Sequence, residues 1–62
     1  MKLKIIDPKY GHRQLQMSLQ EAQQLHRDEY PSYGIVQDDR VTTRDRMQEG
    51  LDTTFVPQLA GG

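Results

Sequence analysis

The sequence predicts an α+β fold, in which a mixed four- to five-stranded sheet packs against one main helix. Two observations carry this prediction. Apolar residues alternate with lysines over residues 1–6, which is the period of a strand with one buried face, and residues 51–57 are expected to form another strand. Over residues 19–28, apolar residues recur every three to four positions, which is the period of an amphipathic helix.

A hairpin is expected first. Residues 1–6 alternate apolar residues with lysines, and residues 13–17 alternate again, with Leu15 and Met17 on one face. Residues 7–12 lie between them and contain proline and glycine, which favour turns. Two alternating runs joined by such a loop predict an antiparallel hairpin.

The helix is expected to begin after Ser18 and to end before Pro31. Ser18 and Glu21 have the spacing of a capping box, in which each side chain binds a backbone N–H of the first turn. The residue before a proline is pushed out of the helical region, so Tyr30 closes the helix. The apolar stripe, which is expected to face the hairpin, consists of Leu19, Ala22 and Leu25 or His26.

Three more strands are expected after the helix. Residues 34–37 and 40–42 flank a tight turn at Asp38-Asp39. The polar stretch that follows contains one apolar residue, Met47, which we expect to plug the underside of the sheet.

The last strand is expected over residues 51–57, with Thr53 and Phe55 on one face. A hairpin, a right-handed crossover helix and a long, central last strand that pairs beside the first strand suggest a β-grasp (ubiquitin-like) fold. We assign residues 1–57 to this domain and residues 58–62 to a flexible tail.

Length and composition limit the possible functions. A chain of 62 residues forms one domain, which buries only about 60% of the surface that its unfolded form exposes. Hydrophobic residues make up 34% of the chain, too few for both a core and an enclosed active site. We therefore do not expect an independent enzyme.

The absence of cysteine excludes disulfide bonds and thiolate sites. A net charge of −1 gives no electrostatic reason to expect nucleic acid or an acidic membrane as a partner. The sequence has no apolar run long enough for a membrane span, and no signal-peptide pattern at its start. We expect a cytoplasmic protein.

No side chain in this sequence is expected to be catalytic or to bind a metal ion. His12 and His26 have no second ligand at metal spacing, and His26 is expected to interact with the helix dipole. Capping explains Ser18, and turn chemistry explains the adjacent carboxylates of Asp38 and Asp39.

The closing segment, Pro57-Gln58-Leu59-Ala60-Gly61-Gly62, is where function is expected. A Gly-Gly pair has no side chains, so it can enter a narrow channel and deliver the carboxylate of Gly62. Pro57 stiffens the exit from the sheet, because proline fixes φ and lacks an N–H. Leu59 is either an anchor for a partner pocket or a residue folded back on the sheet. A frayed tail or an added segment is the plain alternative.

Residues 49–62 resemble the carboxyl terminus of the ubiquitin-like sulfur carriers. The similarity is closest to the small subunit of molybdopterin synthase, whose tails share the form Phe-x-Pro-x-apolar-Ala-Gly-Gly seen here over residues 55–62. Residues 36–41 are similar to the hairpin that precedes the tail in that family and in the thiamin-pathway sulfur carriers. Two positions depart from the family pattern: Leu51 follows Gly50, where aspartate is usual, and Thr53 replaces a buried aliphatic residue.

The resemblance implies a carrier whose Gly62 carboxylate is adenylated by an enzyme similar to ubiquitin-activating enzyme. A sulfur donor then converts the adenylate to a thiocarboxylate, which serves a sulfur-accepting synthase. The partner enzyme uses ATP, and this chain binds no cofactor of its own. Gly61 and Gly62 are then the activated end, and the expected partner contacts are Phe55, Pro57, Leu59 and Ala60.

Two other functions stay open. One is that of the modifiers, in which a thiol captures the adenylated carboxyl group and passes it to an amine of a target protein. Tail assembly proteins of some bacteriophages share a similar fold and ending, which would make the chain a binding or structural module.

Overall fold

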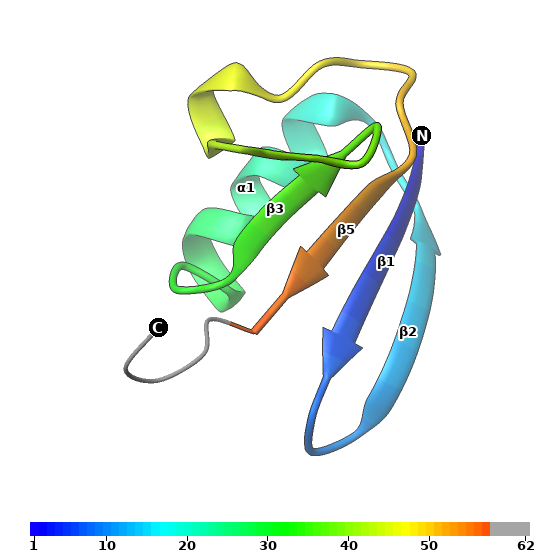
Figure 1. The fold of residues 1–62 in the computed structure, drawn as a ribbon, viewed down its shortest axis with the longest axis vertical. Coiled ribbons are helices and arrows are strands. Elements are labelled where there is room, and N and C mark those ends of the chain that lie inside the picture. The colour runs from blue at the N-terminus through cyan, green and yellow to red at the C-terminus, as the bar shows by residue number, and fades with distance from the viewer. Residues whose placement is uncertain (58–62) are drawn as a thin grey trace.

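The computed structural model describes residues 1–57 as an α+β domain with a five-stranded mixed sheet and one α-helix across one of its faces (Figure 1). The elements in chain order are β1 (Lys2–Asp7), β2 (Gly11–Gln16), α1 (Leu19–Glu29), β3 (Gly34–Gln37), β4 (Arg40–Thr42), a short 3₁₀ helix η1 (Arg44–Arg46) and β5 (Thr53–Val56). The predicted order of strands and helix is confirmed.

The strands lie in the order β2-β1-β5-β3-β4. β5 runs parallel to β1 and antiparallel to β3, and both outer pairs are antiparallel. The last strand is therefore central and lies beside the first, as predicted. Its predicted length is wrong, because β5 covers four residues and not residues 51–57. A turn at Glu49-Gly50, with Gly50 at φ +87°, and a bend at Leu51 delay the start of pairing until Thr53.

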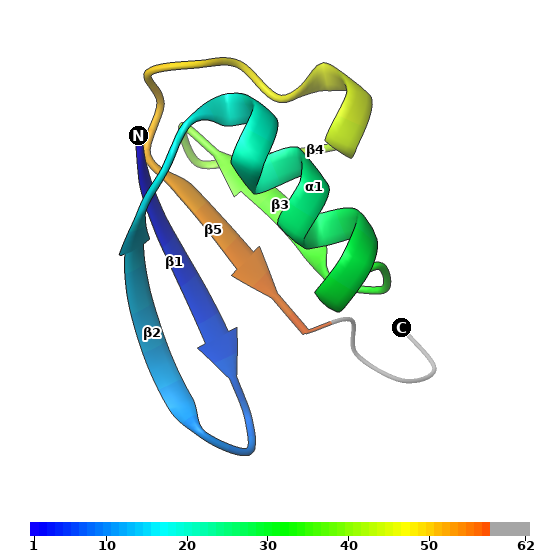
Figure 2. The ribbon, with the colours of Figure 1, turned by 180° about the vertical axis from the view of Figure 1, so that it is seen from behind.

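The core lies between the sheet and α1, which lies in front of β3 with β5 beside it in Figure 2. Its buried apolar side chains are Leu3, Ile5, Ala22, Ile35, Met47 and Phe55. Met47 enters the core directly after η1, as predicted. Of the two alternatives for the helix stripe, His26 is buried and Leu25 is only half-buried.

The helix begins and ends as its sequence predicts. The backbone N–H of Glu21 donates to Ser18 Oγ at 3.2 Å, and the N–H of Ser18 donates to Glu21 Oε1 at 3.1 Å, which completes the capping box. At the other end, the N–H of Tyr30 donates to the carbonyl of His26, directly before Pro31. Both ends are fixed by local contacts, which is why the sequence could place them.

The two hairpin turns are also confirmed. Asp38 and Asp39 both have positive φ, at 51° and 61°, as a two-residue type I′ hairpin turn requires. In the first hairpin, Asp7 Oδ1 accepts hydrogen bonds from the N–H groups of Lys9 and Tyr10.

A buried polar network connects β3, β5 and the loop before β5. Gln37 and Thr53 are 4% and 1% exposed. Gln37 Nε2 donates to Thr53 Oγ1 at 2.8 Å and to the carbonyl of Gln48 at 2.9 Å, and Gln37 Oε1 accepts from the N–H of Gln48. Thr53 Oγ1 donates to the carbonyl of Leu51. Thr53 therefore takes the place of an aliphatic residue without leaving a polar atom unpaired, and Gln37 supplies the partner.

We expect Thr53→Val to lower the free energy of unfolding by about 1–3 kcal/mol, because it removes a donor to Leu51 and an acceptor for Gln37 within a buried network. Thr54→Val is the matched control, since its side chain lies on the opposite face of the same strand, and it should change stability by less than about 0.5 kcal/mol. Urea unfolding of both variants measures the difference. Equal stability of the two would contradict the structural importance of the network.

The capping box predicts a dependence of stability on pH. The hydrogen bonds from the backbone N–H and the hydroxyl of Ser18 lower the pKa of the Glu21 carboxyl from its ordinary 4.5. A lowered pKa in the folded state means that the carboxylate stabilises the fold above its unfolded pKa, and that this contribution is lost as pH falls through the folded pKa. We therefore expect Glu21→Gln to melt below the parent at neutral pH. The difference should shrink as pH falls through the lowered pKa of Glu21, because the carboxyl is then protonated in the folded state as well. A difference that does not change as the pH is lowered would contradict this account.

Candidate functional site: the exit of strand β5

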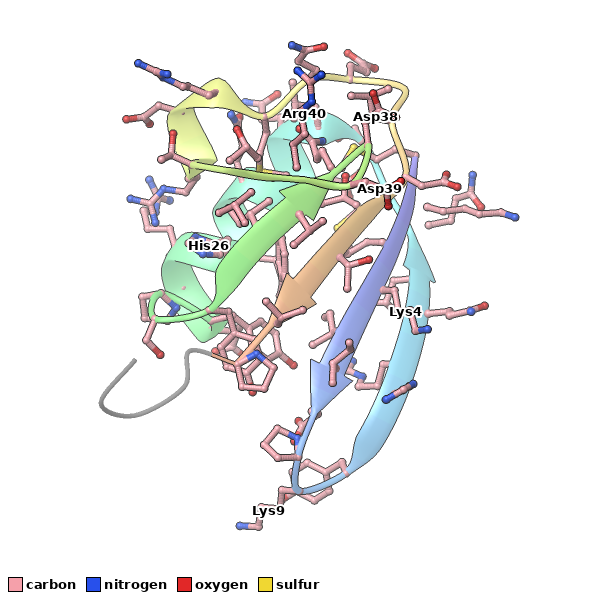
Figure 3. The ribbon with its side chains drawn as sticks, viewed as in Figure 1. Lys4, Lys9, His26, Asp38, Asp39 and Arg40 are labelled. Carbon is pink, nitrogen blue, oxygen red and sulfur yellow. The ribbon has the colours of Figure 1, made fainter. Side chains whose placement is uncertain are left out.

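The chain leaves the sheet after β5, at one end of the molecule. Val56 lies opposite Gly34, the first residue of β3, and β5 runs parallel to β1. The exit therefore lies at the same end of the sheet as the β1–β2 turn. Figure 3 shows Lys9 at this end and the Asp38-Asp39 turn at the other. Pro57, the last described residue, is half-buried.

Phe55 anchors the exit to the core. Its side chain has no exposed surface, and its neighbours in the adjacent strands are Ile5 and Ile35. Its ring meets His26 edge-on at 5.2 Å between centroids, and the Tyr30 ring lies at 6.2 Å. The prediction that Phe55 contacts a partner needs correction, because a completely buried side chain offers no surface. Strand alternation turns Phe55 toward α1, so its function is to fix β5.

His26 supports Phe55 from the helix. It is 6% exposed, and its Nε2 lies 2.8 Å from the carbonyl oxygen of Tyr33. A carbonyl only accepts, so Nε2 carries the proton and the Nδ1 lone pair faces Arg44 Nη1 at 3.4 Å. The structure places His26 in the last turn of α1, and its expected interaction with the helix dipole stays a prediction. The ring also makes a buried hydrogen-bonded contact between α1, the loop before β3 and η1.

An aliphatic strip lies on the sheet face that α1 leaves open. Ile6, Val36 and Val56 are half-buried on this face, and Val41 on the edge strand is 83% exposed. Gly34 belongs to the strip because a Cβ at this position would lie only 3.3 Å from Val56 Cγ2. The strip therefore runs from the β4 edge to Val56, the residue before Pro57. The alternation of each strand in the sequence indicates which of these residues face away from the helix. The strand order is also needed to show that they form one surface.

Tyr33 lies directly before β3, near the exit. Partial burial raises the pKa of the Tyr33 hydroxyl, and the negative charge of Asp7 raises it further. Tyr33 packs edge-on against Tyr30, at 4.8 Å between ring centroids. It therefore stays neutral at physiological pH and acts as a packing residue.

The described part of the chain contains two of the predicted site residues, Phe55 and Pro57. The other four, Leu59, Ala60, Gly61 and Gly62, lie outside the described residues. Within residues 1–57, no three His, Asp or Glu side chains gather closely enough to hold a metal ion. The one α-helix in this range is not long and apolar enough to cross a membrane.

Comparison with known proteins adds no relative. No family model matches the sequence, and neither a curated protein nor a solved structure matches the chain. The resemblance of residues 49–62 to the sulfur carriers stays a prediction that rests on the motif.

We expect Phe55→Ala to cost about 3–5 kcal/mol, because it leaves a cavity among fully buried side chains. This is comparable with the whole stability of a domain of this size, so the variant should lose its cooperative unfolding transition. Circular dichroism during heating measures the effect. Val41→Ala, which truncates an exposed aliphatic residue, should keep the transition. A Phe55→Ala variant that melts like the parent would show that Phe55 does not anchor the exit.

Proposed function

We propose that this protein is a ubiquitin-like carrier with a β-grasp fold, and that its working group is the carboxylate of Gly62. An activating enzyme adenylates this carboxylate, and a sulfur donor converts it to a thiocarboxylate for transfer. The strand order β2-β1-β5-β3-β4, with α1 across one face, supports the β-grasp assignment. The tail motif over residues 55–62 supports the chemistry.

The observation that carries the proposal is the way β5 is held. It is paired on both sides, its inward side chains Thr53 and Phe55 are buried, and the chain then leaves the sheet at Pro57. A tail that must reach into the active site of another protein needs a fixed base, because a mobile base would add to the entropy lost on binding. The central strand β5 supplies that base, because it ends at Val56, directly before Pro57.

The chemistry requires nothing from the side chains of this domain. The carboxylate of Gly62 attacks the α-phosphorus of ATP, and pyrophosphate leaves to give an acyl adenylate. A sulfur nucleophile of the partner, such as a persulfide, then attacks the acyl carbon, and AMP leaves with the electron pair of the broken C–O bond. Reductive cleavage of the S–S bond by a partner thiol leaves the thiocarboxylate on Gly62. Glycine suits each attack because it carries no side chain beside the acyl carbon.

The aliphatic strip provides a surface for docking beside the tail. Ile6, Val36, Val41 and Val56 form an apolar area that adjoins Pro57 and lies on the face without a helix. A partner that covers this strip would hold the base of the tail while Leu59 enters a pocket further on. Apolar contacts of this kind are where interfaces concentrate their binding energy.

We expect deletion of Gly61 and Gly62 to abolish ATP–pyrophosphate exchange with the cognate activating enzyme, since the carboxylate no longer reaches the nucleotide. Stability should change by less than about 0.5 kcal/mol, because the deletion leaves the core intact. Leu59→Ala is the companion variant and should keep the reaction but weaken binding by about 1–3 kcal/mol. A deletion variant that is still adenylated as fast as the parent would overturn the proposal. A deletion variant that melts far below the parent would favour a structural module.

Mass spectrometry of the products separates the sulfur carrier from the modifier. Exchange of one carboxyl oxygen for sulfur on the intact chain supports sulfur transfer. A covalent adduct through an amide to a lysine of another protein would instead assign the chain to the modifiers.

A further inference from the structure

The outer edge of β2 has main-chain groups that the sheet does not use. β2 is an edge strand, and β1 is its only neighbour within the described sheet. Met1 and Met17 lie opposite each other and exchange both backbone hydrogen bonds. Such pairs alternate along an antiparallel ladder, so Leu15 and Arg13 also bond to β1. The N–H and C=O groups of the residues between them point outward, and these residues are His12, Gln14 and Gln16.

This edge carries little of the protection that proteins usually give to exposed strands. Residues 12–16 contain no proline, and their only fully charged side chain is Arg13. That guanidinium is turned toward the helix, where Arg13 Nη1 donates to Tyr30 Oη at 2.8 Å. The outward side of the edge therefore remains open to another strand.

A groove lies between α1 and Met17, the residue that follows β2. Its lining residues are Met17, Glu21, Gln24, Leu25, Asp28 and Glu29. Met17 and Leu25 are half-buried and give it an apolar floor. Three of these lining residues carry carboxylates, and none is a lysine or an arginine. The groove is therefore more acidic than the whole chain, whose net charge is only −1.

Two neighbouring arginines bear on this charge. Arg27 Nε pairs with Asp28 Oδ1 at 3.3 Å. Arg27 itself does not line this groove but a different hollow on the other side of α1. Arg13 lies at the strand side and is bound to Tyr30. Glu21 accepts the capping hydrogen bond with one oxygen. The groove remains negative, with Glu29 as the carboxylate that no side chain described here pairs with.

We propose that the β2 edge and this groove together bind an extended peptide that presents an apolar side chain flanked by basic ones. The peptide adds to the sheet beside β2, with main-chain hydrogen bonds to His12, Gln14 and Gln16. Alternate side chains of an added strand point toward the helix side. There the apolar side chain meets Met17 and Leu25, and the basic ones meet the carboxylates. This site does not include Gly62 and does not depend on its activation.

The experiment uses a fluorescently labelled peptide with a central valine, a lysine two positions away on each side and threonine elsewhere. Binding to the full chain is followed by fluorescence polarisation. The control peptide has glutamate in place of both lysines and should bind at least about tenfold more weakly, because like charges meet across the groove. Asp28→Asn with Glu29→Gln should weaken the lysine peptide about two- to fivefold per carboxylate, and less at high salt.

Two proline variants test the edge. Gln14→Pro removes an outward N–H of β2 and should weaken binding at least about tenfold, while the bonds between β2 and β1 remain. Val41→Pro makes the matched change on the other edge strand, β4. Gln37 and Arg40 flank the two-residue turn as a bonded pair, so the N–H of Val41 also points outward. Val41→Pro should bind the peptide like the parent. Equal binding by the two variants would overturn the proposal.

Amide chemical shifts of the parent protein give a second measurement. Because no variant is used, misfolding of a variant cannot affect the result. The lysine peptide should shift the amides of β2 and the side-chain signals of Leu25 and Met17. Shifts confined to β3 and β4, or no shift at millimolar peptide, would overturn the proposal. So would dimerisation of the parent that Gln14→Pro abolishes, because the edge is then occupied by a second copy. The chain without Gly61 and Gly62 should bind the peptide unchanged, which separates this result from failure of the carrier proposal.

Discussion

The sheet depends on one strand that joins two hairpins. β1 pairs with β2, and β3 pairs with β4, but β1 and β3 do not pair with each other. Only β5 connects them, parallel to one and antiparallel to the other. Phe55 sits in the middle of this junction, between Ile5 and Ile35 in the sheet and beneath His26 of the helix. The backbone pairing of β5 therefore joins the two halves of the sheet, and the Phe55 side chain packs this junction against the helix.

Local features of the fold could be predicted from the sequence, because they depend on residues close together in the chain. The capping box of Ser18 and Glu21, the turn at Asp38-Asp39 and the strand periods are of this kind. The network of Gln37 and Thr53 could not be predicted in the same way. The sequence places Thr53 where a buried aliphatic residue is usual, but nothing near it in the chain indicates Gln37 as its partner. Only the register that places them side by side makes their burial favourable.

The candidate site shows the same limit. The motif over residues 55–62 contains both a residue of the last strand and the predicted tail. The motif alone assigns Phe55 a partner contact, although the sheet buries its side chain completely. For a similar reason, the contacts of His26 with Tyr33 and Arg44 could not be predicted. Its burial depends on η1 and on the loop before β3, which approach the helix only in the folded chain.

The position of β5 has a consequence during protein synthesis. The two hairpins and the helix can begin to form as soon as they leave the ribosome, because their contacts are local. The sheet cannot close until Val56 has also emerged, and until then β1 and β3 each expose an inner edge. A nascent or truncated chain without β5 therefore presents two unpaired strand edges, with Leu3, Ile5 and Ile35 uncovered. Chaperones and proteases recognise such surfaces, so quality control of this protein should act on chains in which the last strand is missing.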